Sequence, residues 1–279
     1  MLATQYETTA NGKRLRLARQ GSGPPLILLH GYPENLQIWH ELVPLLAGHF
    51  EVIAFDWPGM GYSQAWPGGA TPAHMAKRLL ALIDGWGLDK VSLLGMDMGG
   101  QPALVFAAEY PNRISHLAVM NSLVFGEADT SWEIRVLRRF GWNRLIIRHL
   151  PRLVYWRARH TFLPRSVGLD PDLVRDFWEA FRQVEVRRFV SKMCAGYQGR
   201  LEQLPESYAR VACPTLVLWG DCDKHFPPIQ AELLAQTIAN SCLAWLVGGE
   251  HWMAAYRAGE VADQLIPFLS SEKGGTGTL

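Results

Sequence analysis

The sequence has few cysteines and no long hydrophobic run. Its four cysteines are scattered among 279 residues, too few for a disulfide framework and without the paired spacing of a metal site. They are Cys194, Cys213, Cys222 and Cys242. No apolar leader opens the chain, and no stretch approaches the length of a membrane-spanning helix. We therefore expect a cytoplasmic protein with no membrane partner.

A strong excess of either charge is also missing. The formal net charge is +1, which disfavours a nucleic-acid partner because no basic surface for phosphates is evident. Hydrophobic residues make up 48% of the chain and charged residues 19%, so a disordered chain is excluded. The 11 tryptophans suit the wall of an apolar cavity. We expect a small hydrophobic organic substrate and water as partners, and the sequence leaves a homodimer open.

Short leucine-rich and β-branched runs alternate with helix-length amphipathic segments. The runs are typical of buried parallel strands and lie at 26–29, 52–55, 91–94, 117–120, 215–219 and 244–247. The expected helices lie at 36–47, 72–86, 99–110, 228–238 and 259–270. This alternation predicts an α/β fold with a doubly wound, mostly parallel sheet.

The alternation stops within residues 123–207, where no strand-like run occurs. Helical windows at 133–149 and 172–192 carry many Arg, Trp and Phe residues. We interpret 123–207 as a helical cap inserted into a core formed by 1–122 and 208–279. Trp142 and Trp156 are candidates to bind substrate beneath it, although aromatic residues at helical spacing also occur in ordinary packing.

Residues 95–100, Gly-Met-Asp-Met-Gly-Gly, lie between a predicted strand and a predicted helix. A serine hydrolase carries Gly-x-Ser-x-Gly at such a turn, but the central residue here is Asp97. A carboxylate with an ordinary pKa is ionised at neutral pH and needs no base to activate it. We predict that Asp97 is a nucleophile that displaces a leaving group from saturated carbon and forms an alkyl ester.

Two further candidate catalytic residues follow later predicted strands, and with Asp97 they give the order nucleophile, acid, histidine. Asp223 comes three residues after Gly220, and His251 follows the last predicted strand. We predict that His251 activates the water that cleaves the ester, and that Asp223 orients His251. Asp221 also follows the strand, but capping of the next helix is the better interpretation for it.

A fourth motif, His30-Gly31-Tyr32-Pro33, follows the first buried strand. Such a loop can aim the backbone N–H of Tyr32 at a developing oxyanion, together with the N–H of Met98. A strained turn would explain the same composition. We predict an oxyanion hole formed by Tyr32 and Met98.

With these motifs the chain resembles the α/β-hydrolase superfamily over nearly its whole length. It looks most like the branch with an aspartate nucleophile, which contains epoxide hydrolases, haloalkane dehalogenases and fluoroacetate dehalogenases. The resemblance implies Asp97 as nucleophile and His251 as base. Some relatives take the acid from the end of the preceding strand, where this chain has Asn121, so Asp223 is the better candidate.

The resemblance also bears on the substrate. Haloalkane dehalogenases, and usually epoxide hydrolases, have tryptophan at the position of Met98, and fluoroacetate dehalogenases carry arginines at the positions of Met98 and Gln101. Epoxide hydrolases present two cap tyrosines. Tyr197 matches one in position and Tyr155 is the candidate for the other, although either could be a packed residue with a satisfied hydroxyl. Trp252, next to His251, resembles epoxide hydrolases and is a candidate for substrate binding.

The sequence thus predicts a hydrolase that opens a hydrophobic epoxide to a diol through an alkyl ester on Asp97. No metal or organic cofactor is expected. A haloalkane or haloacid dehalogenase with the same nucleophile is the alternative. A small-molecule receptor or a degenerate hydrolase is a weaker interpretation, because Asp97, Asp223 and His251 form a complete set.

Overall fold

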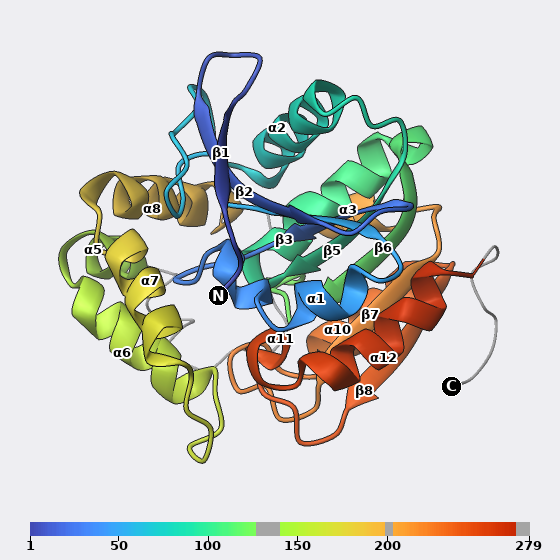
Figure 1. The fold of residues 1–279 in the computed structure, drawn as a ribbon. Helices are drawn as coiled ribbons and strands as arrows, with labels where there is room; N and C mark the ends of the chain where they lie inside the picture. The colour runs from blue at the N-terminus through green and yellow to red at the C-terminus, as the bar shows by residue number, and fades with distance from the viewer. Residues whose placement is uncertain (127–139, 199–202, 272–279) are drawn as a thin grey trace.

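The structure, a computed structural model, describes residues 1–126, 140–198 and 203–271 and is built on an eight-stranded sheet (Figure 1). The strand order is β1-β2-β4-β3-β5-β6-β7-β8. β1 and β2 are antiparallel to their neighbours, and β3 to β8 are parallel. The strands are Gln5–Thr8, Arg14–Gln20, Pro25–Leu29, Glu51–Phe55, Val91–Met96, Ile114–Met120, Thr215–Gly220 and Ser241–Leu246. The predicted α/β fold with a mostly parallel sheet is confirmed.

Helices cover both faces of this sheet. Alternate strand residues point to opposite faces, so Ile27 and Leu29 join one buried cluster while Leu26 and Leu28 join the other. Residues of α2, α3 and α10 complete the first cluster, and residues of α1 and α12 the second. In the order α1, α2, α3, α10 and α12 these helices span Leu42–Leu46, Pro72–Gly85, Gly100–Glu109, Ile229–Thr237 and Ala258–Leu269.

Capping residues and prolines determine where α2 and α1 begin. The Thr71 hydroxyl accepts a hydrogen bond from the His74 N–H, and Pro72 occupies the first position of α2. The expected helix at 36–47 is instead a 3-10 helix, η1 (Leu36–Trp39), followed by α1. Pro44 has no N–H to donate to the preceding turn, so it fits only the first turn of a new helix.

The first two strands were not predicted from the sequence. β1 is largely exposed, and β2 alternates arginine with leucine, so neither contains a continuous apolar run. Both are antiparallel strands at one side of the sheet, where a strand does not have to be apolar on both faces. A search for buried parallel strands therefore misses them.

Several helices between β6 and β7 lie together beside the sheet (Figure 1). They are α5 (Trp142–His149), α6 (Pro151–Thr161), α7 (Pro171–Phe181) and α8 (Val184–Gln198), with the short α9 (Leu204–Tyr208) after them. The window at 172–192 is thus two helices, and neither Arg182 nor Gln183 between them is a Gly or Pro that would signal a break. Residues 133–139 of the other window lie outside the described residues. The boundaries of the cap at 123–207 stay a prediction.

A buried ionic network joins α7 to the sheet. A nitrogen of the Arg16 guanidinium on β2 lies 3.2 Å from a carboxylate oxygen of Asp176 on α7, and another lies 3.5 Å from Asp56 after β4. Asn35 donates to Asp176 at 2.7 Å. Burial raises the pKa of Asp56 to about 6, although Arg16 opposes this increase. Because removal of one partner would leave a buried charge unpaired, this network fixes α7 against the core.

No helix among the described residues is both long enough and apolar enough to span a bilayer.

Candidate active site

The turn after β5 holds Asp97 in a backbone conformation that side chains rarely adopt. Its φ is 52°, and its N–H donates to the Asn121 carbonyl at 3.1 Å. A Cβ on Gly95 would lie 2.6 Å from the Gly99 carbonyl oxygen, and one on Gly99 would lie 2.2 Å from that of Leu29. Glycine at both positions therefore permits the tight turn that lifts Asp97 above the sheet.

His251 lies between two carboxylates. Its Nε2 is 2.9 Å from Oδ2 of Asp97, and its Nδ1 is 2.8 Å from Oδ2 of Asp223. All three side chains are buried. They come from loops that follow the parallel strands β5, β7 and β8, whose carboxyl ends meet at one edge of the sheet. The structure thus brings together the three residues that we predicted as a triad.

Asp223 is held in place by donors from several elements. The backbone N–H groups of His225 and Phe226 donate to Oδ1 at 2.7 and 3.0 Å. The Asn121 amide, at the end of β6, donates to Oδ2 at 2.6 Å. These donors fix the position of the carboxylate that accepts from His251. Asp221, by contrast, is exposed and accepts from the Gly248 N–H at 2.6 Å, so its hydrogen bond fastens the loop after β8.

The two carboxylates control the charge of His251. Burial alone would lower its pKa, but Asp223 and Asp97 together raise the pKa to about 10. The imidazole is therefore protonated at neutral pH. Any reaction that neutralises Asp97 removes part of this effect and lowers the pKa of His251.

Glu34 is a buried carboxyl group that the sequence reasoning missed. It accepts from the Gly31 N–H and from Nε1 of Trp252, both at 3.2 Å. Burial, followed by the charge of Asp97, raises its pKa to about 8, while His251 opposes the rise. Glu34 is therefore neutral at pH 7 and braces both the predicted oxyanion loop and Trp252. Its place directly after His30-Gly-Tyr-Pro was the available signal, but the sequence does not show that this acid is buried.

The loop of His30 and Gly31 lies against the Asp97 side chain. A Cβ on Gly31 would fall 2.3 Å from both Cβ and Oδ1 of Asp97. His30 donates through Nδ1 to the Gly31 carbonyl at 2.7 Å and accepts from the Trp57 N–H at 3.2 Å. Burial lowers the pKa of His30 to about 4, so its neutral ring holds the loop.

The two residues of the predicted oxyanion hole flank Asp97. The Met98 N–H donates to Oδ1 of Asp97 itself. Tyr32 follows Gly31, and its ring stacks on Phe181 with centroids 6.4 Å apart. The N–H of Met98 thus already points at the carboxyl group on which an oxyanion would form. The oxyanion role of Tyr32 stays a prediction.

The two candidate tyrosines lie in different environments. The buried Tyr197 hydroxyl, on α8, donates to the Met98 carbonyl at 3.1 Å. Its pKa lies well above the usual value because of burial, with smaller increases from Cys194 and Asp97. Tyr155 instead donates to the Val174 carbonyl at 2.6 Å. The charged residues that act on Tyr155 are Arg159 and Asp176, whereas Asp97 acts on Tyr197, and we therefore leave Tyr155 out of the proposed catalytic set.

The three candidate tryptophans also separate. Trp252 is fully buried beside the triad, where its ring packs edge-on against Phe162 at 5.2 Å. Trp142 is 51% exposed and stacks on Phe140, so the structure places it on the surface instead of in a pocket. Trp156 is 59% exposed but lines the cavity described next.

A cavity of about 190 Å³ opens beside the triad. Its inner wall contains Phe162 and His225, whose ring centroids lie 4.4 and 5.2 Å from that of His251. The lining residues are Tyr32, Pro33, Asn143, Ile146, Ile147, Leu153, Val154, Trp156, Arg157, Ala158, Phe162 and His225. This volume is below the roughly 300–1,000 Å³ of sites for drug-sized ligands, so it suits a small, largely apolar molecule. Within the described ranges no group of three His, Cys, Asp or Glu residues is placed to hold a metal ion.

Comparison with known proteins identifies the family. The family model for the alpha/beta hydrolase fold matches residues 24–257. The chain belongs to the α/β-hydrolase family. It is 27% identical to a fluoroacetate dehalogenase from Burkholderia sp. over 282 residues, which cover 91% of this chain and 90% of that protein. It is 35% identical to a soluble epoxide hydrolase from Corynebacterium sp. (strain C12) over 120 residues, only 43% of this chain and 42% of that protein.

A solved α/β-hydrolase structure has the same fold over nearly the whole chain. This structure, of a thermophilic esterase from Thermogutta terrifontis, has a TM-score of 0.79 and 26% identity, and covers 96% of this chain and 98% of its own. The relatives thus include several kinds of hydrolase. The family assignment makes this protein a hydrolase. The kind of hydrolase has to be inferred from the residues at the triad.

Proposed function

We propose that this α/β hydrolase is an epoxide hydrolase that works through a covalent ester on Asp97. The observation that carries the proposal is a buried carboxylate at the turn after β5, 2.9 Å from His251 and next to a backbone carbonyl that the Tyr197 hydroxyl contacts. A carboxylate attacks saturated carbon, for which a serine hydroxyl would first need a base.

In the first step, Asp97 attacks an epoxide carbon. A carbon–oxygen bond forms to Asp97 while the ring carbon–oxygen bond breaks, and its electron pair stays on the epoxide oxygen. The Tyr197 hydroxyl, near Asp97, protonates this alkoxide. Tyr197 then takes up a proton again. Its source is protonated His251, because esterified Asp97 is neutral and no longer stabilises the charge on the imidazole.

In the second step, neutral His251 removes a proton from water, and the hydroxide attacks the Asp97 ester carbonyl. The N–H groups of Met98 and Tyr32 stabilise the tetrahedral oxyanion. Collapse of the intermediate breaks the bond between the carbonyl carbon and the alcohol oxygen. The departing alkoxide takes a proton from the imidazolium and leaves as the diol. The carboxylic acid formed on Asp97 then gives its proton to His251, which restores the carboxylate and the protonated imidazole of the free enzyme.

Dehalogenation is the second candidate because the match to the fluoroacetate dehalogenase covers nine-tenths of both chains. Two local features favour epoxides over halides. The Met98 side chain offers no N–H to a departing halide, and the buried Gln101 amide donates to the Leu123 carbonyl. These two positions therefore provide neither a halide donor nor a cation for a haloacid.

A substrate panel tests the choice. The protein should convert styrene oxide to its diol, and release of halide from bromoalkanes or haloacetates should be slow or absent. Measurement of diol by chromatography and of halide by ion chromatography reports both reactions in one series. Halide release without diol formation would reverse the assignment.

Tyr197→Phe separates ring opening from ester hydrolysis. Because the alkoxide would lose its proton donor, the rate of ester formation from styrene oxide should fall about 10²-fold or more. The second tyrosine provides a matched control, since Tyr155→Phe removes a hydroxyl that, within the described part of the chain, donates to the Val174 carbonyl. Stopped-flow single-turnover measurements distinguish the two variants. An unchanged rate of ester formation in Tyr197→Phe would remove this residue from the mechanism.

A further inference from the structure

The cavity beside the triad contains one arginine among largely apolar residues. Arg157 lies on α6, four residues after Leu153 and three after Val154, so the three residues share a helix face. Among the described residues the Arg157 side chain forms no hydrogen bond or ion pair, and only its backbone carbonyl accepts, from the Thr161 hydroxyl. Arg157 is half-buried and lines the cavity, and it has no counter-ion among the residues that the structure describes.

The stretch of sequence that contains Arg157 carries no acidic residue. Residues 141–169 contain six arginines and no aspartate or glutamate. Among the described residues that line the cavity, none is acidic either. An arginine without a carboxylate in a partly desolvated position is a ready site for an anion, because the fixed fork of its N–H donors matches a carboxylate.

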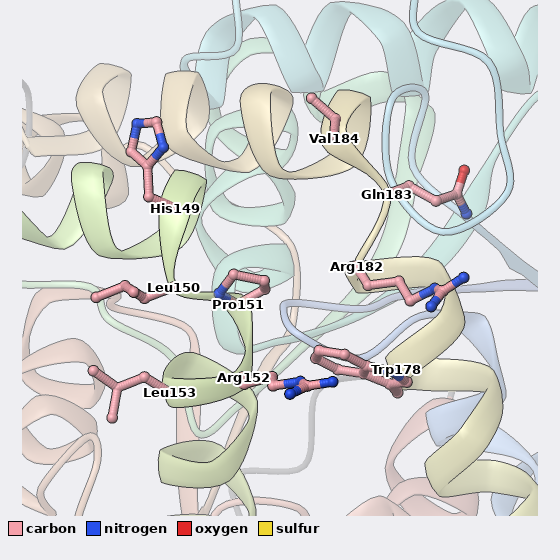
Figure 2. A pocket seen from close by; sticks show the side chains of 9 residues that line it. All are labelled: His149, Leu150, Pro151, Arg152, Leu153, Trp178, Arg182, Gln183 and Val184. Carbon is pink, nitrogen blue, oxygen red and sulfur yellow. The ribbon is translucent and has the colours of Figure 1, made fainter.

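A larger surface groove, which also borders Leu153, is likewise lined by basic residues. It has a volume of about 670 Å³, and Figure 2 shows His149, Arg152 and Arg182 around it, with the Arg152 side chain extending towards Trp178. The described residues that line this groove also include no acid, and Leu153 borders both hollows. Basic groups around an approach to the site raise the local concentration of anions.

We propose that the substrate is a small amphiphilic anion, with its reacting carbon at Asp97 and a carboxylate bound by Arg157. The apolar part lies against Ile146, Ile147 and Val154 of the same cavity. This inference rests on the proposed function and narrows the expected hydrophobic substrate to an epoxide that carries an acid group. Arg157 is then the residue that determines specificity.

A pair of substrates that differ only in charge tests the proposal. The probes are an octanoate that carries a terminal epoxide and the methyl ester of the same acid. For the acid, kcat/KM should exceed that for the ester about tenfold, since a charge-assisted hydrogen bond is lost with the ester. In Arg157→Gln this preference should disappear, mainly through a higher KM for the acid, while turnover of the ester changes less than about twofold.

Arg148→Gln is the matched control. It removes the same charge from the neighbouring helix, but Arg148 is exposed and lines neither hollow. Arg157→Lys should keep part of the preference for the acid over the ester. This result would show that a positive charge at this position, in a folded variant, is enough to bind the carboxylate. Equal diol formation from both probes, unaltered in Arg157→Gln, would overturn this inference and leave the epoxide hydrolase assignment intact. Diol from neither probe nor styrene oxide would instead refute the proposed function.

Discussion

His251→Gln should accumulate the substrate on Asp97. Glutamine cannot take the proton from water, so ester hydrolysis should slow by about 10⁴-fold, as for loss of a member of a catalytic triad. Ester formation continues because Asp97 is ionised without help from a base. Mass spectrometry of the protein after exposure to styrene oxide should show one added substrate mass, located on the peptide that contains Asp97.

The adduct has to depend on the nucleophile. The double variant Asp97→Asn, His251→Gln keeps the size of both side chains but removes the attacking carboxylate, and it should show no added mass. Replacement of the exposed His49, far along the chain from the triad, provides a control for the loss of a histidine. A His251→Gln protein with full multiple-turnover activity would contradict the proposed role of His251 in water activation.

Gly31→Ala should abolish most activity although it adds a single methyl group. The new Cβ would lie 2.3 Å from Cβ of Asp97, so the turn that carries the nucleophile has to move. Displacement of a reacting group by about 1 Å costs roughly 10²-fold in rate, and we expect at least this loss in the rate of ester formation. Gly31 has no positive φ, so the effect comes from the contact and not from backbone conformation.

A second glycine separates this effect from a general loss of stability. Gly259 in α12 has open space around the position of a Cβ, and Gly259→Ala should keep full activity. Single-turnover rates, corrected for the folded fraction from circular dichroism, compare the two variants. Near-normal ester formation in folded Gly31→Ala would show that the loop does not fix the position of Asp97.

The geometry of the triad could be predicted because it depends on strand ends. Apolar runs located the parallel strands, and the carboxyl ends of parallel strands meet at one edge of the sheet. Asp97, Asp223 and His251 each follow such a run within a few residues. Their positions after these runs therefore implied their proximity, and in the structure hydrogen bonds join His251 to Asp97 and to Asp223.

Features that depend on tertiary burial could not be predicted in this way. Glu34 is an acidic residue in a loop, and only the packed structure shows that it lies within the core beside Asp97. Tyr155 and Arg157 are two positions apart on α6 and therefore lie on nearly opposite sides of the helix, and only the packed structure shows that the side with Arg157 lines the cavity. The helical windows predicted at 133–149 and 172–192 do not include α6, so the orientation of its residues could not be predicted either.

A single turnover in water labelled with oxygen-18 tests the covalent intermediate most directly. Excess enzyme is mixed with styrene oxide, and the diol and the Asp97 peptide are analysed after one turnover. Because water attacks the carbonyl carbon of the ester, the label should appear in the Asp97 carboxyl group, and the diol should carry unlabelled oxygen from Asp97. Label that enters the diol directly and never reaches Asp97 would contradict the mechanism.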